Sequence, residues 1–217
     1  LAAGGLRYTQ FYNAAKCHTT RASLMAGLYP HQTGCELPLE ARVTRDSSRR
    51  VCHSGISIAV VLQGAGYATF ASGKWHAGGR PTSRGFDHFF GLPGGACSYF
   101  TPAKVLQRDD ARATFSAAEE FYFTDVITDE AVENLTQHFE SDSERPFFLY
   151  VAYTAPHWPM QAREEDIARY RGRYSDGWQA IRKQRLQRLV DMGIISPKCE
   201  LPEMEPPNDW HDNEYHT

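Results

Sequence analysis

The segment from Phe147 to Tyr153 (FFLYVAY) is the feature that most restricts how this chain can fold. Every residue in it is apolar, aromatic or β-branched, which is typical of a strand buried on both faces. Pro156 and Pro159 follow, and they end the strand and stiffen the loop after it. A strand of this kind favours a sheet with helices on both sides.

Helical patterns alternate with the predicted strands. Asp125 to Glu140 is predicted to form an amphipathic helix with Thr124 as its N-cap, directly before the strand at 147–153. The apolar stripe of this helix consists of Ile127, Ala131, Leu135 and Phe139. Ser57 to Gln63 predicts a short helix, and Tyr67 to Ala71 predicts the strand that follows it. The alternation predicts an α/β sandwich with a mostly parallel sheet.

Cys17 lies where the sequence predicts the start of a helix. Two Thr residues follow it, and Arg21 to Leu28 has a helical composition, with Leu24 and Leu28 on one face. The unpaired N–H groups at such a helix start bind anions, and Arg21 adds a fixed planar cation one turn along. The pattern favours a site for a tetrahedral oxyanion with a reactive group at its base. Taken alone, Cys17 fits a buried structural thiol better than a reactive group.

Lys74 and His76 follow the predicted strand at 67–71. Ligands of α/β sheets bind at the carboxyl ends of strands, and alternation in an extended segment would aim both side chains the same way. His157 occupies the loop after the strand at 147–153 and has an exchangeable proton near neutral pH. In isolation, Lys74 and His76 also fit a pair of solvent-exposed side chains without a function. His157 in isolation also fits a structural histidine in a rigid turn.

Three segments together resemble the type I sulfatases: Cys17 to Gly34, Gly66 to His76, and Arg145 to Pro159. Arg84 to Gly91 is similar to the text that follows the second of these in that family. The resemblance covers nearly all of residues 1–195, and the sequence departs from the usual pattern at Thr19, where the family has Pro or Ala. It implies the alkaline-phosphatase-like α/β/α fold and hydrolysis of a sulfate ester to an alcohol or phenol and inorganic sulfate.

The resemblance also implies a modified nucleophile. In the family the cysteine of the first motif is oxidised to formylglycine by a formylglycine-generating enzyme, and the hydrated aldehyde attacks sulfur. Carried to this sequence, Cys17 is the catalytic residue and, as formylglycine, also a metal ligand. Arg21 and Lys74 then hold the aldehyde hydrate and the sulfate oxygens.

Three further side chains receive roles from the same resemblance. His76 positions or deprotonates the nucleophile, and His157 contacts the sulfate and acts as an acid toward the leaving alcohol. Ser98 falls where some members place a hydroxyl group near the sulfate, so it is a candidate for substrate binding. The expected substrate is a small-molecule or saccharide sulfate ester.

The family binds a divalent cation, usually calcium, through acidic and amide residues that we expect to lie outside this chain. Asp212-Asn213 lacks a preceding apolar strand and belongs to the irregular, acidic, Pro-rich segment expected at 196–217. Residues 1–195 are then a partial sulfatase catalytic domain. We expect this polypeptide alone to bind calcium weakly and to lack sulfatase activity. A basic helix over Trp178 to Met192, ended by Gly193, closes this domain, and 102–120 is expected to be irregular.

Composition excludes some other classes of function. The net charge of the 217 residues is −3, which gives no case for nucleic acid, and no apolar run reaches the roughly 18 residues of a membrane span. The five cysteines have no zinc-type spacing, although Cys35 and Cys52 could pair in an oxidising compartment. No signal segment is visible, and the family implies a periplasmic, secreted or lysosomal location. Two alternatives stay open: a phosphate or phosphonate monoester hydrolase of the same fold, and a non-catalytic truncated homologue.

Overall fold

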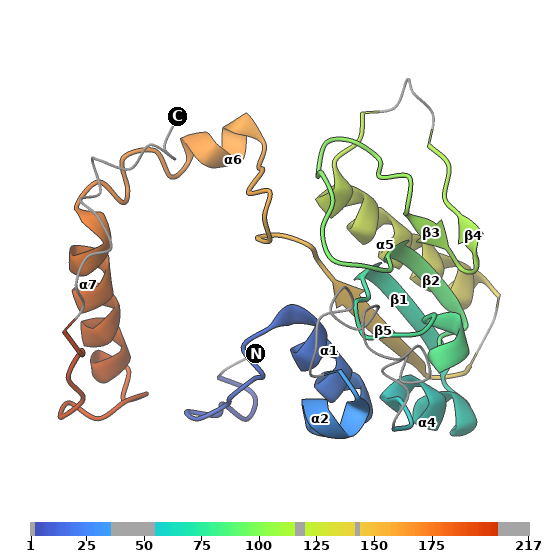
Figure 1. Cartoon of the computed structure of the whole chain (residues 1–217), viewed down its shortest axis with the longest axis horizontal. Helices are drawn as coiled ribbons and strands as arrows, with labels where there is room; N and C mark the ends of the chain where they lie inside the picture. The colour runs from blue at the N-terminus through green and yellow to red at the C-terminus, as the bar shows by residue number, and fades with distance from the viewer. Residues whose placement is uncertain (1–2, 36–54, 116–119, 142–143, 204–217) are drawn as a thin grey trace. The chain divides into compact units, whose positions relative to one another are not determined.

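A computed structural model describes residues 3–35, 55–115, 120–141 and 144–203 (Figure 1). The chain divides into two compact units: one contains Asn13–Gln161, and the other contains Leu1–Tyr12 with Ala162–Thr217. We refer to Asn13–Gln161 as the sheet unit, and every residue singled out above for catalysis or binding lies in it. The predicted boundary between residues 195 and 196 stays a prediction.

A five-stranded sheet forms the centre of the sheet unit, with the order β4-β3-β2-β1-β5. Strand β1 (Ala68–Lys74) pairs in parallel with β2 (His88–Leu92) on one side and with β5 (Phe147–Ala152) on the other. Lys74 lies opposite Leu92 and Gly73 lies opposite Ala152, so the carboxyl ends of the three strands meet at one edge of the sheet. The predicted mostly parallel α/β sheet is confirmed.

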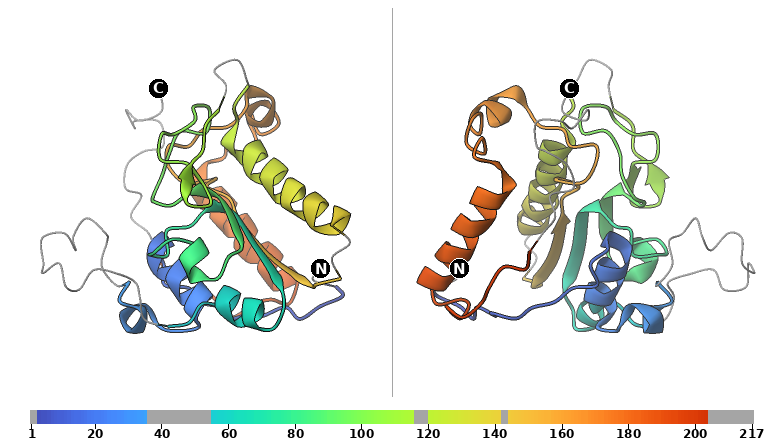
Figure 2. Two further views of the ribbon diagram at one scale, coloured as in Figure 1. Left: turned by 90° about the vertical axis from the view of Figure 1, so that its right-hand side faces the viewer. Right: turned by 60° about the vertical axis from the view of Figure 1, so that its left-hand side comes forward.

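Helices cover both faces of this sheet (Figure 2). The long helix α5 (Phe123–Glu140) covers one face. Helices α1 (Cys17–Ala26) and α4 (Ile58–Gly64) lie on the other face, with the short α2 (Pro30–Thr33) beside α1. Short segments such as the 3₁₀ turn η2 (Thr82–Arg84) connect these elements.

Each face of the sheet has its own apolar core, because successive side chains of a strand point to opposite faces. One core joins the sheet to α1 and α4, and the other joins it to α5. The first contains Ala22, Met25, Ala59, Ala71, Trp75, Phe86 and Phe89; the second contains Phe90, Leu92, Leu106, Phe121, Phe123 and Ile127. Ser72 on β1 also donates a hydrogen bond of 2.7 Å to the carbonyl of Ile127, which ties α5 to the central strand.

Two glycines let the three parallel strands approach closely near their carboxyl ends. Gly73 has φ +111°, and a Cβ built there would lie 2.2 Å from the carbonyl oxygen of Ala152. Gly91 has φ +147°, and its Cβ would lie 1.9 Å from the carbonyl oxygen of Gly73. Only glycine fits such positions without moving the backbone.

Several helix predictions need correction. Helix α1 begins at Cys17 rather than Arg21, and its N-cap is Lys16, so Thr19 and Thr20 lie inside the first turn instead of capping it. Leu24 is 58% exposed, and Leu28 lies beyond the αL residue Gly27. The buried side chains of α1 are His18, Thr19, Ala22 and Met25. Of the polar side chains in this set, His18 contacts the ring of His76, which lies just after β1.

Helix α5 begins one residue before Thr124, whose side chain is therefore not the N-cap. Ile127 and Ala131 are buried as predicted, but Phe139 is 60% exposed and His138 is buried in its place. The His138 ring contacts Phe70 edge-on, and its Nε2 lies 2.9 Å from the carbonyl oxygen of Arg145. The hydrogen bond of His138 therefore places this polar residue at the end of the buried face of α5. A pattern of apolar residues could not predict that.

Strand β5 is the outer strand of the described sheet. Its residues are half-buried to exposed apart from Ala152, and Phe147 is 40% exposed. The prediction of a strand buried on both faces is therefore wrong within the described residues. The prediction of an irregular segment at 102–120 also needs correction, because β3 (Gln107–Arg108) and β4 (Ala111–Arg112) form an antiparallel hairpin against β2.

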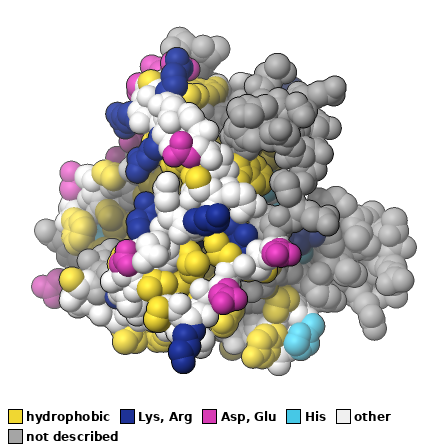
Figure 3. All heavy atoms as spheres, turned by 90° about the vertical axis from the view of Figure 1, so that its left-hand side faces the viewer, with side chains coloured by type: hydrophobic (Ala, Val, Ile, Leu, Met, Phe, Trp, Pro, Cys, Tyr) yellow, Lys and Arg dark blue, Asp and Glu magenta, His cyan; other side chains and the backbone are white. Residues whose placement is uncertain are grey.

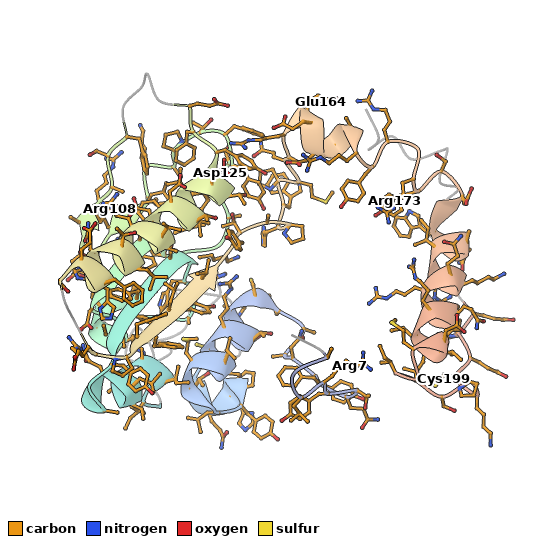
Figure 4. All side chains as sticks on the ribbon, turned by 180° about the vertical axis from the view of Figure 1, so that it is seen from behind. Arg7, Arg108, Asp125, Glu164, Arg173 and Cys199 are labelled. Carbon is orange, nitrogen blue, oxygen red and sulfur yellow. The ribbon has the colours of Figure 1, made fainter. Side chains whose placement is uncertain are left out.

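Arg108 of this hairpin lies beside α5 and makes a bidentate ion pair with Glu130 of that helix (Figure 4).

None of the described helices is long and apolar enough to span a membrane. Cys35 is disulfide-bonded, and its expected partner Cys52 lies outside the described residues.

The second unit contains α6 (Glu164–Ala168) and α7 (Gly177–Asp191). Helix α7 ends at Asp191, with Met192 as its C-cap and the left-handed Gly193 next, which confirms the predicted basic helix to within about one residue. No residue of α7 is buried, and the face drawn in Figure 3 mixes apolar, cationic and acidic side chains. Glu164 accepts a 2.7 Å hydrogen bond from Arg171 within this unit (Figure 4).

Candidate active site

Cys17 is the first residue of α1 and is half-buried with a free thiol. Its position places the side chain beside the first N–H groups of the helix, which have no partners within α1. These groups carry the positive end of the helix dipole and favour an anion at this point. Thr19, two residues on, is buried, and its hydroxyl group donates to the carbonyl of Lys16 at 3.0 Å. The helix start at Cys17 is observed, and the anion site there stays a prediction.

Arg21 connects α1 to two strands of the sheet. Its Nη1 donates to the carbonyl oxygen of Lys74 at the end of β1 and to the hydroxyl group of Tyr150 on β5, the latter at 3.2 Å. A guanidinium group has five N–H donors, so these bonds fix its plane and leave further donors for an anion.

Lys74 brings a buried ammonium group to the same place. It is the last residue of β1 and only 1% exposed. Burial lowers its pKa below the ordinary 10.5, the charge of Cys17 raises it, Arg21 lowers it further and Cys97 raises it. These influences require all three groups to lie within electrostatic reach of Lys74. A desolvated cation beside a helix N-terminus and an arginine is a strong point for holding an oxyanion.

His76 approaches Cys17 by a different route from the one predicted. Its φ of +50° is left-handed, so the alternation expected from an extended segment stops there. Its ring centroid lies 5.4 Å from that of His18, which is 6% exposed. The ligand atoms of Cys17, His18 and His76 all lie within 4.8 Å of one another. Two imidazoles therefore flank the thiol, and only one of them was predicted.

The loop after β2 closes another side of this group. The N–H groups of Trp75 and His76 donate to the carbonyl oxygens of Leu92 and Pro93, at 2.9 and 3.1 Å. Cys97, later in the loop, has a half-buried free thiol, and burial raises its pKa to about 11 although Lys74 lowers it. At neutral pH this thiol is protonated and adds no negative charge beside Lys74.

His157 and Ser98 lie in two loops that are bonded to each other. Tyr99 donates from its hydroxyl group to the carbonyl of His157 at 2.7 Å, and its N–H donates to Gln161 Oε1 at 2.8 Å. Ser98 Oγ donates to the same Gln161 oxygen at 3.4 Å. The imidazole of His157 is exposed, with Nδ1 2.6 Å from the carbonyl oxygen of Trp158. The structure brings Cys17, Arg21, Lys74 and His76 together, whereas Ser98 contacts Gln161 and His157 contacts Tyr99 and Trp158 in the two bonded loops.

Four residues near these groups were not predicted: His18, Cys97, Tyr99 and Tyr150. Tyr150 belongs to the predicted strand at 147–153. The alternation of side chains along a strand predicts which face of the sheet Tyr150 points to, but not which residue it contacts. His18 directly follows Cys17, so its place in the first turn of a helix was a usable signal. The proximity of Cys97 to Lys74 depends on the path of the loop after β2, and no local pattern indicates it.

The donor set around Cys17 bears on metal binding. Among the described residues it consists of two imidazoles and a thiol. Calcium takes six to eight oxygen ligands, so these side chains do not fit a calcium ion.

The sequence as a whole was compared with known proteins. The model of the sulfatase family matches residues 1–200. The chain belongs to the sulfatase family. It is 30% identical to the arylsulfatase of Klebsiella aerogenes over an alignment of 237 positions, gaps included, which covers 97% of this chain and 48% of that protein. The chain spans less than half of the length of the curated relatives that it matches first.

Solved structures agree with the family and with the fold. Ps i-CgsB in complex with k-i-k-neocarrahexaose matches with a TM-score of 0.58 and 32% identity, over 71% of this chain and 38% of that one. BT4656 in complex with its substrate D-glucosamine-2-N,6-O-disulfate matches with a TM-score of 0.54 and 25% identity, over 72% and 28%. The sheet unit is thus part of the alkaline-phosphatase-like fold of this family, in which formylglycine and a divalent metal are general features.

Proposed function

We propose that this chain forms part of a sulfuric ester hydrolase that releases inorganic sulfate from a sulfate ester. The observation that carries the proposal is the convergence of the buried Lys74 and the clamped Arg21 on Cys17 at the N-terminus of α1. Sulfate is a tetrahedral oxyanion, and these groups offer it two cations and the positive end of a helix. Membership of the sulfatase family supports the same activity.

Formylglycine fits the position of Cys17. The side chain is half-buried at the N-terminus of α1, and a ring nitrogen of His76 lies within 4.8 Å of its sulfur atom. A hydrated aldehyde supplies two hydroxyl groups on one carbon, so one can attack sulfur and the other can later help to expel sulfate. Arg21 and Lys74 would hold this group in place. A formylglycine-generating enzyme would then be a partner of the newly made chain.

Arg21 and Lys74 also act on the sulfate oxygens. Negative charge on these oxygens shifts during transfer, and fixed donors in a site that excludes water stabilise the transition state. The bonds from Arg21 to Tyr150 and to the backbone of Lys74 orient the guanidinium group before the substrate arrives. Pre-orientation of this kind avoids reorganisation during the reaction.

Proton transfer falls to the two histidines. His76 accepts a proton from the attacking hydroxyl group, and His157 donates one to the oxygen of the leaving alcohol. In the net reaction the S–O bond of the ester breaks, the oxygen of one water molecule ends in sulfate, and the alcohol gains a hydrogen. His157 is exposed, as expected for a group that meets the substrate from the solvent side, and Ser98 lies in the neighbouring loop.

The proposed metal is a divalent cation, and calcium is the expected ion. The described side chains around Cys17 do not supply its oxygen ligands, so no step is assigned to it.

The proposed substrate is a sulfated saccharide. Two of the matching structures contain carbohydrates, namely k-i-k-neocarrahexaose and D-glucosamine-2-N,6-O-disulfate. We further propose an oxidising compartment, which the disulfide bond of Cys35 supports. Residues 1–195 are proposed as the catalytic part and 196–217 as a separate irregular segment.

The test is hydrolysis by the protein expressed from the complete reading frame, together with a formylglycine-generating enzyme. Matched sulfate and phosphate esters of the same phenol are assayed, with Cys17→Ala as the control. Preferential release of sulfate that disappears in the control supports the proposal. Preferential release of phosphate favours a phosphomonoester hydrolase, and turnover of neither ester favours a non-catalytic homologue.

A further inference from the structure

A cavity of about 430 Å³ is lined in part by the loop after β2, which also borders the candidate active site. Its walls are Leu92 to Ala96, after β2, and Lys104 to Gln107 with Arg112, from the β3–β4 hairpin. None of these residues was assigned a role in the reaction. The lining combines an apolar floor, which includes the accessible Pro93 and Val105, with two cationic side chains, Lys104 and Arg112.

The cavity shares a wall with the candidate active site. Pro93 accepts the hydrogen bond from the N–H group of His76, and a Cβ on Gly95 would lie 3.8 Å from Cε1 of the His76 ring. Leu92 is the register partner of Lys74. The cavity therefore borders the candidate active site across the loop that follows β2.

The two cations of the cavity differ from their neighbours in having no acid beside them. Arg80 pairs with Asp110 at 3.6 Å, and Arg108 pairs with Glu130. Lys104 and Arg112 are both exposed and form no ion pair with any other residue in the described part of the chain. Two unpaired cations over an apolar floor are complementary to a sugar ring that carries an anionic group.

We propose that this cavity is a subsite for a second anionic group on the sugar next to the one that carries the reacting sulfate. This inference rests on the proposed function and extends it to substrate choice. Arg112 pairs with the second anion through two N–H donors, Lys104 adds a point charge, and the apolar floor packs against the ring. A sulfate group and a uronate carboxylate offer the same chemistry, and the test separates them.

The test compares substrates that differ only in the second anion. The formylglycine-containing protein is assayed with a nitrophenyl sulfate and with three disaccharides: one that carries only the reacting sulfate, one with a second sulfate, and one with a uronate carboxylate. Variants Arg112→Gln and Lys104→Gln are measured beside Arg80→Gln, an exposed cation outside the cavity lining.

We expect the second anion to lower the KM of the unsubstituted protein about tenfold, as for a charge-assisted pair. Arg112→Gln should remove most of this gain, Lys104→Gln a smaller part, and Arg80→Gln none. Turnover of the nitrophenyl sulfate should stay the same in all three variants. The disaccharide with the larger gain identifies the second anion as sulfate or carboxylate. Equal KM values with and without the second anion overturn the inference, as does an equal rise in KM with Arg80→Gln.

A binding measurement separates this inference from the proposed function. The unconverted protein, with its Cys17 thiol, is titrated calorimetrically with the same disaccharides. If no ester is hydrolysed but the disaccharide with two anions binds more tightly, and Arg112→Gln removes the difference, the subsite stands while the proposed function fails. If hydrolysis proceeds but the titration finds no gain from either second anion, the subsite is wrong while the proposed function stands.

Discussion

Replacing Lys74 with methionine separates the catalytic and the structural contributions of this side chain. Lys74 is 1% exposed, and burial is the largest cause of its lowered pKa. A methionine keeps most of the length of the side chain and removes the buried charge. Exchange of buried charged groups for apolar ones is often neutral or stabilising, by up to about 4 kcal/mol. We therefore expect Lys74→Met to be at least as stable as the unsubstituted protein at neutral pH.

The pH dependence of this stability difference has a definite sign. Between the lowered pKa of folded Lys74 and the ordinary 10.5, the unfolded chain binds more protons than the folded chain. The stability of the unsubstituted protein therefore rises with pH across this window as far as Lys74 is concerned, whereas methionine contributes no such change. The stabilising effect of Lys74→Met should be largest at and below the lowered pKa and should shrink as the pH approaches 10.5.

Activity should move in the opposite direction. Loss of one preorganised donor to a developing oxyanion typically costs a factor of about 10²–10³ in turnover. Urea unfolding at about pH 7 and about pH 10 measures the stability, and hydrolysis of a nitrophenyl sulfate by the converted protein measures the activity. Turnover within about tenfold of the unsubstituted protein would refute the role of Lys74. A parallel loss of stability and activity at neutral pH would refute the reasoning about its burial.

Three more perturbations and one titration follow from the same structure. Tyr150→Phe removes the 3.2 Å partner of Arg21 and should lower kcat/KM about fivefold with little change in stability, as kinetics and urea unfolding would measure; an unchanged kcat/KM would contradict the clamp. Gly91→Ala should prevent stable folding because its Cβ would meet the carbonyl of Gly73, whereas Gly64→Ala, with open space around it, should unfold at the same urea concentration as the unsubstituted protein or a higher one. Ile127→Ala should cost about 2–5 kcal/mol in urea unfolding, since Ile127 is fully buried between α5 and the sheet; a cost below about 1 kcal/mol would contradict that packing. Calorimetric titration of this 217-residue chain with calcium should show weak binding, and tight binding would contradict the donor set described around Cys17.

The sequence allowed prediction of those parts of the site that depend on local rules. The Thr residues after Cys17 indicated a helix start, although the helix begins at Cys17 itself and these residues lie inside its first turn. The end of a β-prone run before Lys74 placed that residue at the carboxyl end of a strand, where the sheet indeed ends. Parallel pairing then brings such strand ends together at one edge.

The parts that depend on tertiary contacts were not predictable in this way. The left-handed φ of His76 ends the alternation that was expected to orient its side chain, and the ring reaches Cys17 beside His18 instead. His138 replaces Phe139 in the core because its ring contacts Phe70 and its Nε2 meets the carbonyl of Arg145. The β3–β4 hairpin has two-residue strands, which are too short for a periodic signal.

Mass spectrometry of the peptide that carries Cys17 decides whether the proposed nucleophile forms. The protein is expressed from the complete reading frame, together with a formylglycine-generating enzyme, and digested. We expect an aldehyde and its hydrate at position 17, with Thr19 tolerated in the modification motif. An intact thiol under these conditions would contradict this expectation, because the cations around Cys17 would then surround a residue that lacks the proposed nucleophile.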